Sequence, residues 1–207
     1  MRGGLRRIGL FGGSFNPPHL AHLALARLAR DELQLQQVRW LPAGQPWQKP
    51  AGSLAPGEHR AAMACLLAQD DTDFVVDTRE IERQGPSYTI DTVRELRAEQ
   101  PGAEIVLIIG QDQYANLDTW RDAAQLRSLV TLAVAARNGR QPAPPAAWAH
   151  IPHRLVLLPL PPMAISATDI RQRIAQQQPI EALVGKAVAG YIDLHHLYRA
   201  NQAHTGH

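Results

Sequence analysis

The sequence is poor in cysteine and in aromatic residues. Cys65 is the one cysteine among 207 residues, which excludes a disulfide within the chain and a Cys-x-x-Cys zinc site. It lies in an apolar run at residues 61–68, so we expect a small core residue at this position. Aromatic side chains make up 5% of the chain, and aliphatic residues must therefore fill most of its core.

The chain also lacks a strong charge and a long apolar run. A formal net charge of +2 is too small to indicate a nucleic-acid or anionic membrane surface, although it allows a local basic pocket for phosphates. No stretch approaches the ~20 apolar residues that span a membrane, and no apolar signal region precedes the first strand-like run. We expect a cytoplasmic protein that binds neither nucleic acid nor membranes.

Strand-like and helix-like segments alternate along the chain. Short apolar runs predict strands at residues 5–11, 38–41, 74–76, 104–109, 129–135 and 155–158. Helical spacing of apolar residues predicts helices at 19–33, 58–68, 88–99, 168–175 and 186–192. Proline- and glycine-rich stretches predict loops at 44–57 and 139–149.

This alternation indicates an α/β fold, with a doubly wound and mainly parallel sheet of the Rossmann-like kind. We expect one domain over residues 1–200, with a small C-terminal helical part, and a polar tail at 201–207. Ligands of such sheets bind outside the carboxyl ends of the strands, at the point where the strand order reverses. Site residues are therefore sought in the loops that follow the predicted strands.

The first candidate site follows the first strand and reads Gly12-Gly13-Ser14-Phe15-Asn16-Pro17-Pro18-His19-Leu20-Ala21-His22. Two glycines let a ligand approach the backbone closely, while Asn16 and Pro17 suit the cap and first position of a helix. His19 and His22 share one face of its first turn, beside backbone N–H groups that can bind phosphate oxygens. A capped helix with incidental histidines is the plain alternative, and a metal site lacks an evident third ligand.

The second candidate site reads Ile165-Ser166-Ala167-Thr168-Asp169-Ile170-Arg171. Ser166 and Asp169 have the spacing of a capping box, which is common at ordinary helix starts. The functional interpretation adds the Thr168 hydroxyl and the Arg171 guanidinium to the N–H groups of the helix start. Together these donors can hold the β- and γ-phosphates of a nucleotide.

Weaker signals come from isolated residues in other loops. Gly110-Gln111-Asp112 follows a strand, where a carboxylate can accept hydrogen bonds from a ribose, and the Trp120 indole can stack on a flat ring. Gly85-Pro86-Ser87-Tyr88-Thr89 is a turn and a capped helix start that can present N–H groups to a carboxylate. Lys49 and Arg137 are possible phosphate contacts, and each is more commonly a solvated charge.

Residues 12–22 and 165–171 together resemble the nucleotidyltransferase superfamily with paired-His and Ile-Ser-Ser-Thr-x-x-Arg motifs. Residues 86–89, 110–112 and Trp120 narrow the resemblance to the bacterial nicotinate-nucleotide adenylyltransferases, over roughly residues 7–199. The resemblance implies a Rossmann-like fold, Mg²⁺ as cofactor with ATP, and adenylyl transfer to nicotinate mononucleotide in NAD biosynthesis. Catalysis by His19, His22 and Arg171 is part of what it implies.

The resemblance also implies which residues hold the two substrates. ATP is assigned Gly12, Gly13, Ser14, Phe15, His19, His22, Gly110, Asp112, Ile165, Ser166, Thr168 and Arg171. Nicotinate mononucleotide is assigned Asn16, Lys49, Tyr88, Thr89, Trp120 and Arg137. No side chain is assigned to the metal, because Mg²⁺ bridges phosphate oxygens and keeps several waters.

Four parts of the sequence depart from the family pattern. Asn16 replaces the usual Asp, Ala21 the usual Gly, and Ala167 the second Ser of the C-terminal motif. The usual Pro-Pro-His-Lys loop reads Pro46-Trp47-Gln48-Lys49, and Lys49 is the residue carried over from it.

Two other functions remain open from the sequence. A phosphopantetheine adenylyltransferase would share both outer motifs, but nothing in that family requires residues 86–89 and Trp120. A nucleotide-binding sensor without catalysis would bind ATP and not turn it over. A homo-oligomer is compatible with the sequence, which does not set the oligomeric state.

Overall fold

The computed structural model describes residues 6–44, 54–136 and 142–199. Within them, six strands form one parallel sheet in the order β3-β2-β1-β4-β5-β6. The strands are β1 (Arg7–Gly13), β2 (Gln37–Pro42), β3 (Phe74–Val76), β4 (Glu104–Gly110), β5 (Thr131–Ala135) and β6 (Leu155–Leu158). The α/β fold with a parallel sheet is therefore confirmed.

The strand order reverses between β1 and β4. The chain runs outward from β1 through β2 to β3, and then returns to place β4 beside β1, with Ile8 opposite Ile105. The loops that leave β1 and β4 consequently diverge to opposite faces, and a crevice opens at the carboxyl edge between them.

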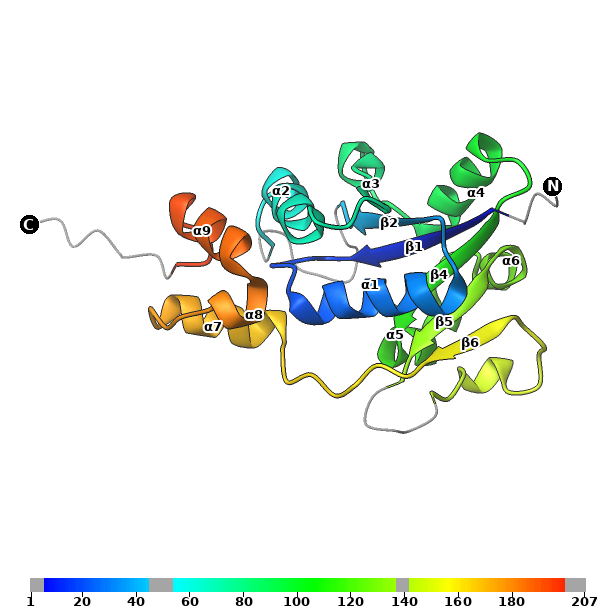
Figure 1. Cartoon of the computed structure of the whole chain (residues 1–207). Helices are drawn as coiled ribbons and strands as arrows, with labels where there is room; N and C mark the ends of the chain where they lie inside the picture. The colour runs from blue at the N-terminus through cyan, green and yellow to red at the C-terminus, as the bar shows by residue number, and fades with distance from the viewer. Residues whose placement is uncertain (1–5, 45–53, 137–141, 200–207) are drawn as a thin grey trace, which may run out of the picture.

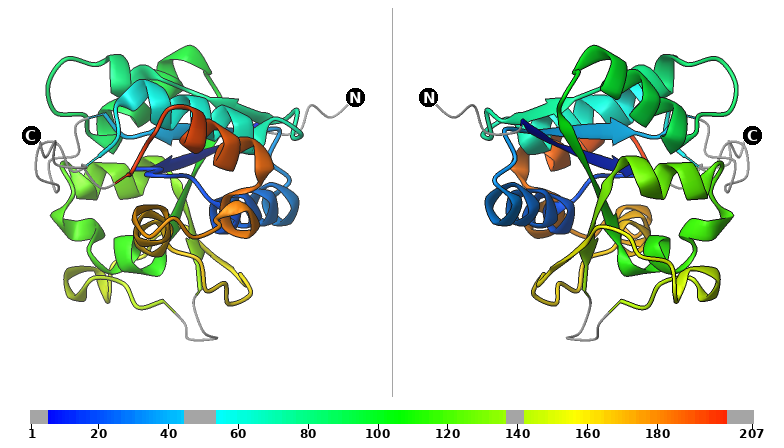
Figure 2. Two further views of the ribbon diagram at one scale, coloured as in Figure 1. Left: turned by 90° about the vertical axis from the view of Figure 1, so that its left-hand side faces the viewer. Right: turned by 90° about the vertical axis from the view of Figure 1, so that its right-hand side faces the viewer.

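Helices cover both faces of the sheet (Figures 1 and 2). On one face the core is formed with α1 (Leu20–Leu33) and α2 (Gly57–Ala68), and it extends to buried residues of α7 (Ala167–Ala175), α8 (Glu181–Val184) and α9 (Lys186–Leu194). The other face packs against α4 (Thr89–Glu99), α5 (Gln111–Ala115) and α6 (Ala123–Leu129). In Figure 1, α7, α8 and α9 lie at the end of the molecule toward which the strand arrows point.

The apolar runs of the sequence are explained by this double covering. In β4, Val106 and Ile108 belong to the core on the α1 side, whereas Ile105 and Leu107 belong to the core on the α4 side. A strand buried on both faces needs apolar residues at nearly every position. The indole of Trp40 in β2 is fully buried and packs on the ring of Phe11 with 5.1 Å between centroids.

Short helices account for most differences from the predicted elements. Leu129 ends α6 rather than starting a strand, and β5 begins at Thr131. The sequence did not predict α3 (Arg79–Glu82), α5, α6, α8 or the 3-10 turns Leu117–Thr119 and Ala146–Trp148. Segments of three to seven residues are too short to display a helical period. Residues 45–53, 139–141 and the tail at 201–207 lie outside the described part.

The prediction for Cys65 is wrong, because its side chain is exposed. The buried face of α2 is formed by Ala61, Ala64 and Ala68 together with Met63, and Cys65 lies on the other side of the helix. An apolar run identifies a buried helix without showing which of its positions faces outward. In the part of the chain that the structure describes, no helix is long and apolar enough to cross a membrane.

Candidate functional site

A cavity of about 420 Å³ opens at the carboxyl edge of the sheet, where the strand order reverses. The ends of β1 and β4, the start of α4 and the start of α7 all contribute to its walls. Its lining includes Gly12, Gly13, Ser14, Phe15, Asn16, His19, His22, Tyr88, Thr89, Gly110, Trp120, Ala167 and Arg171. The fold thus brings residues from all four sequence motifs to one place.

The helix α1 begins later than the sequence predicts. Asn16 and Pro17 each precede a proline, which disfavours helical backbone, and the first helical residue is Leu20. His19 is the N-cap, with an extended backbone at φ −150° and ψ 169°. The prediction that Asn16 caps the helix and Pro17 starts it is therefore wrong.

The two histidines form a stacked pair at this helix start. Their ring centroids are 3.7 Å apart, and the backbone N–H of His19 donates to Nδ1 of His22 at 3.2 Å. Phe15 packs edge-on against the His22 ring. Burial, and secondarily the neighbouring His19, hold the pKa of His22 well below its usual value. A neutral His22 that accepts at Nδ1 carries its proton on Nε2, and so presents a hydrogen-bond donor.

Asn16 joins three distant segments. Its side chain is 3% exposed, and its Oδ1 accepts hydrogen bonds from the Ala55 N–H and the Tyr198 hydroxyl, both at 2.9 Å. Its carbonyl oxygen accepts from the Arg171 guanidinium at 2.8 Å. Asn16 lines the cavity and also fixes its wall, and an oxygen acceptor is what these two donors require of this position.

The C-terminal motif forms a capped helix start with one half of the predicted capping box, since the Asp169 carboxylate accepts from Arg173 instead. The Ser166 hydroxyl accepts from the Asp169 N–H at 3.1 Å and caps α7. Ala167 and Arg171 line the cavity, and the Arg171 guanidinium also donates to the Thr168 hydroxyl at 3.3 Å. Ser166 and Thr168 are exposed and do not belong to the cavity lining, while Ile165 packs against the core on the α1 side.

The opposite end of the cavity is aromatic and cationic. Tyr88 is the N-cap of α4, Thr89 is its first residue, and both line the cavity together with Trp120. The Arg121 guanidinium lies 4.8 Å from the centre of the Tyr88 ring and also lines the cavity. No pattern in the sequence indicated a role for Arg121, although it directly follows Trp120.

A buried carboxylate supports this end of the cavity. Glu80 accepts a hydrogen bond from the Thr92 hydroxyl at 2.9 Å, and burial raises its pKa above the usual value. Arg83 donates to the hydroxyls of Ser87 and Thr92. Residues 80–83 therefore hold the turn before Tyr88. No sequence signal identified them, because their partners lie 4 to 12 positions away along the chain.

Besides Ile165, Ser166 and Thr168, three further predicted residues do not line the cavity or cannot be placed. Gly110 and Gln113 line it, but Asp112 is exposed on α5 and is not part of the lining. Lys49 and Arg137 lie outside the described residues.

The donors in the cavity suit phosphate better than a bare metal ion. Its lining offers imidazoles and guanidinium groups, whereas Mg²⁺ prefers carboxylate and water oxygens. Across the described ranges, no group of three or more His, Cys, Asp or Glu side chains is arranged to hold a metal. The residues present therefore fit a Mg²⁺ ion that enters on phosphate oxygens and keeps its waters.

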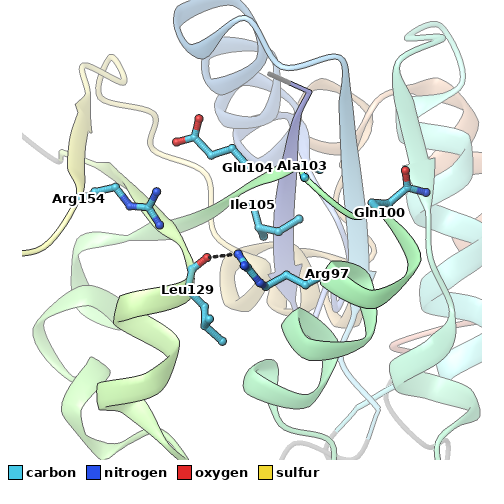
Figure 3. A pocket seen from close by; sticks show the side chains of 8 residues that line it. Arg97, Gln100, Ala103, Glu104, Ile105, Leu129 and Arg154 are labelled. Carbon is cyan, nitrogen blue, oxygen red and sulfur yellow. Dashed lines mark hydrogen bonds between the residues drawn. The ribbon is translucent and has the colours of Figure 1, made fainter. Parts of the chain in front are cut away.

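A second, smaller cavity lies at the other end of β4 (Figure 3). It measures about 200 Å³ and is lined by Arg97, Glu104 and Arg154, with Arg97 donating to the Leu129 carbonyl at 3.3 Å. None of the described residues that the sequence predicts for a site lies in it.

The fold and the larger cavity define an α/β nucleotide-binding protein, in which the starts of α1, α4 and α7, two imidazoles and two arginines face one crevice. The family model described as cytidylyltransferase-like matches residues 10–173. A relative from Methylibium petroleiphilum, named probable nicotinate-nucleotide adenylyltransferase, is 49% identical over 93% of this chain and 92% of its own. A relative of the same name from Bordetella petrii is 48% identical over 94% and 100%.

The chain therefore belongs to the cytidylyltransferase-like family and, within it, to the nicotinate-nucleotide adenylyltransferases. A solved structure from Plasmodium falciparum, nicotinic acid mononucleotide adenylyltransferase complexed with NaAD, has the same fold. Its TM-score is 0.76 at 16% identity, covering 93% of this chain and 97% of that one.

Proposed function

We propose that this protein transfers the adenylyl group of ATP to nicotinate mononucleotide, and releases nicotinate adenine dinucleotide and pyrophosphate. The observation that carries the proposal is the arrangement of one cavity. Hydrogen-bond donors that can bind phosphate lie at the starts of α1 and α7, and Tyr88 and Trp120 form an aromatic end. The names of the relatives at 48–49% identity agree with this reaction.

The phosphates of ATP lie at the histidine end in this proposal. His19, His22 and Arg171 contact them, together with the backbone of Gly12, Gly13, Ser14 and Phe15 and the residues 165–168 at the start of α7. Helix starts bind anions through their unpaired N–H groups and their dipole. The ribose of ATP lies at Gly110 and the exposed Asp112, which a bound nucleoside can reach from the edge of the cavity.

The nicotinate ring lies at the aromatic end. Trp120 stacks on the ring, and the backbone at Tyr88 and Thr89 binds its carboxylate at the start of α4. Asn16, Lys49 and Arg137 bind the rest of this mononucleotide, away from its ring. Arg121, which the structure adds to the lining, supplies a positive charge near the carboxylate.

The reaction is an in-line displacement at the α-phosphorus of ATP. An oxygen of the nicotinate mononucleotide phosphate forms a new bond to that phosphorus, the bond to the bridging oxygen breaks, and its electrons leave with pyrophosphate. The attacking phosphate is already anionic and needs no strong base. Catalysis comes from positioning and from neutralising charge that develops on the leaving phosphates.

Mg²⁺ supplies charge neutralisation on the phosphate oxygens when it is bound with ATP. The partners of the protein in this proposal are its two small-molecule substrates. Its place in the cytoplasm and its assembly as a homo-oligomer stay predictions.

The test is pyrophosphate release with ATP and Mg²⁺ and three acceptors side by side. We expect turnover with nicotinate mononucleotide, and much less with nicotinamide mononucleotide or phosphopantetheine. Preference for phosphopantetheine would show that the protein is a phosphopantetheine adenylyltransferase. ATP binding without turnover of any acceptor would show that the protein is a nucleotide-binding sensor. Either result would contradict the roles proposed for Tyr88, Thr89 and Trp120.

A further inference from the structure

Arg60 is a buried cation that no step of the proposed reaction uses. It lies in the first turn of α2, and its side chain is 3% exposed. Arginine side chains are seldom buried to this extent, because removing a guanidinium from water is costly unless its charge and its donors are satisfied.

The donors of Arg60 are satisfied by the main chain beside the cavity. Its Nε and Nη1 atoms donate to the carbonyls of Ala55 and Ser14, both at 2.9 Å, and its Nη2 donates to Gly44 at 3.4 Å. Ser14 belongs to the loop after β1 that lines the cavity, and Ala43 beside Gly44 lines it too. Ala55 in turn donates to the side chain of Asn16. One guanidinium therefore joins the loops that follow β1 and β2 to the segment that enters α2.

The charge of Arg60 is not cancelled by these contacts. Its hydrogen bonds within the described residues go to carbonyl dipoles, which stabilise a cation without neutralising it. Burial lowers the pKa of Arg60, and the neighbouring Tyr198 hydroxyl opposes that effect, but a guanidinium stays protonated at neutral pH. A full positive charge consequently lies behind the loop that carries Ser14. In a region of low dielectric such a charge attracts anions over a longer distance than it would in water.

We propose that Arg60 is a positioning residue for phosphate binding: it fixes the loop of Ser14 against those of Gly44 and Ala55, and its charge attracts the phosphates that this loop contacts. The inference rests on the proposed function for the identity of the phosphate ligand. It does not need the acceptor to be nicotinate mononucleotide, since any nucleotide triphosphate bound at this loop would meet the same charge.

The experiment compares the full chain with Arg60→Lys and Arg60→Met by titration calorimetry with inorganic pyrophosphate, at two salt concentrations and well below each melting temperature. We expect Arg60→Met to weaken pyrophosphate binding about tenfold or more and to reduce its dependence on salt. Arg60→Lys keeps the charge and is expected to bind pyrophosphate within about threefold of the parent. Its kcat should nevertheless fall, because the single nitrogen of an ammonium cannot reach three carbonyls that are spaced around the three nitrogens of a guanidinium.

Arg27→Met is the matched control. Arg27 makes an ion pair with the buried Asp71 at 2.8 Å on the α1 side, so its loss destabilises the fold without a contact in the cavity. It should lower the melting temperature and leave pyrophosphate affinity unchanged. If Arg60→Met behaved in the same way, Arg60 would be merely structural and the inference would be overturned.

Two further outcomes are decisive. Where Arg60→Met does not fold, Arg60→Lys carries the test, and parent-like kcat in that variant contradicts the positioning role. If the parent bound pyrophosphate but did not use nicotinate mononucleotide, the proposed function would fall, and the comparison of the Arg60 variants would still decide the present inference.

Discussion

His22 combines a neutral imidazole with a position at a proposed anion site, which would favour the protonated form. Its imidazole is held neutral by burial and by His19, yet it lines a cavity that we propose for phosphates. A neutral His22 already offers an Nε2–H donor, and an anion beside it would also favour the protonated form. The side chain is therefore suited to meet charge that increases as pyrophosphate leaves.

We expect His22→Ala to lower kcat by roughly 10²–10³-fold, the usual cost of one donor that acts in the transition state. His59→Ala is the control, since His59 bonds to the Tyr191 hydroxyl and lies outside the cavity lining. Steady-state kinetics with ATP and nicotinate mononucleotide measure both variants. A near-normal kcat in His22→Ala would show that this residue does not act on the phosphates.

The lowered pKa of His22 also makes a prediction for stability. The unfolded chain binds a proton at His22 below pH ~6.5, whereas the folded protein resists that proton, so folding loses free energy as the pH falls through this range. The slope contributed by one such group is at most about 1.4 kcal/mol per pH unit. Urea denaturation at pH 7.5 and 5.5 should show a smaller loss in His22→Gln than in the parent. Equal losses would indicate that His22 is protonated in the folded protein.

At the scale of elements, the starts of α1 and α7 supply most of the proposed contacts to the ATP phosphates. The start of α7 is fixed by the Ser166 hydroxyl, which accepts from the Asp169 N–H, and Arg171 projects from the next turn into the cavity. The central strand β1 lies close to its neighbours, since a Cβ atom on Gly9 would come within 2.8 Å of the Leu35 side chain. Close packing of this strand holds the loop after it, and hence the histidine pair, in place.

Replacing the cap residue tests the α7 start. Ser166→Ala should lower the free energy of unfolding by about 1 kcal/mol, the usual value of an N-cap side chain, and should raise the KM for ATP. Ser166→Asp retains an acceptor and serves as the control for stability, although its charge should weaken ATP binding further. Denaturation curves and kinetics separate the two effects. An unchanged KM in both variants would place the ATP phosphates elsewhere.

At the scale of the whole molecule, the two ends of the described chain meet at one side chain. Tyr198 and Asn16 are 182 positions apart in sequence and are hydrogen-bonded at 2.9 Å. Burial raises the pKa of Tyr198, so its hydroxyl remains a donor throughout the neutral range. Through this bond the C-terminal part supports the loop that carries the first motif.

Tyr198→Phe should lower the free energy of unfolding by about 1–2 kcal/mol, because one donor to the buried Asn16 is removed. It should also raise the KM for ATP several-fold, because that loop loses a support. The matched control is Tyr191→Phe in the same C-terminal part. It removes the hydrogen bond between Tyr191 and His59 and should affect stability alone. If the KM values of the two variants were equal, the contact would not influence the site.

Local patterns in the sequence determined the fold class and most of the site. Strand and helix periods gave the alternation, and because each motif follows a strand or starts a helix, parallel strands bring His19, His22, Tyr88, Trp120 and Arg171 to one edge. Only the tertiary structure decided which contacts hold the site residues in place. The buried state of Arg60, the contacts of Asn16 and the position of Arg121 depend on partners distant in sequence or across loops, and no local period records such contacts. The exposure of Cys65 was decided in the same way, by which side of α2 meets the sheet.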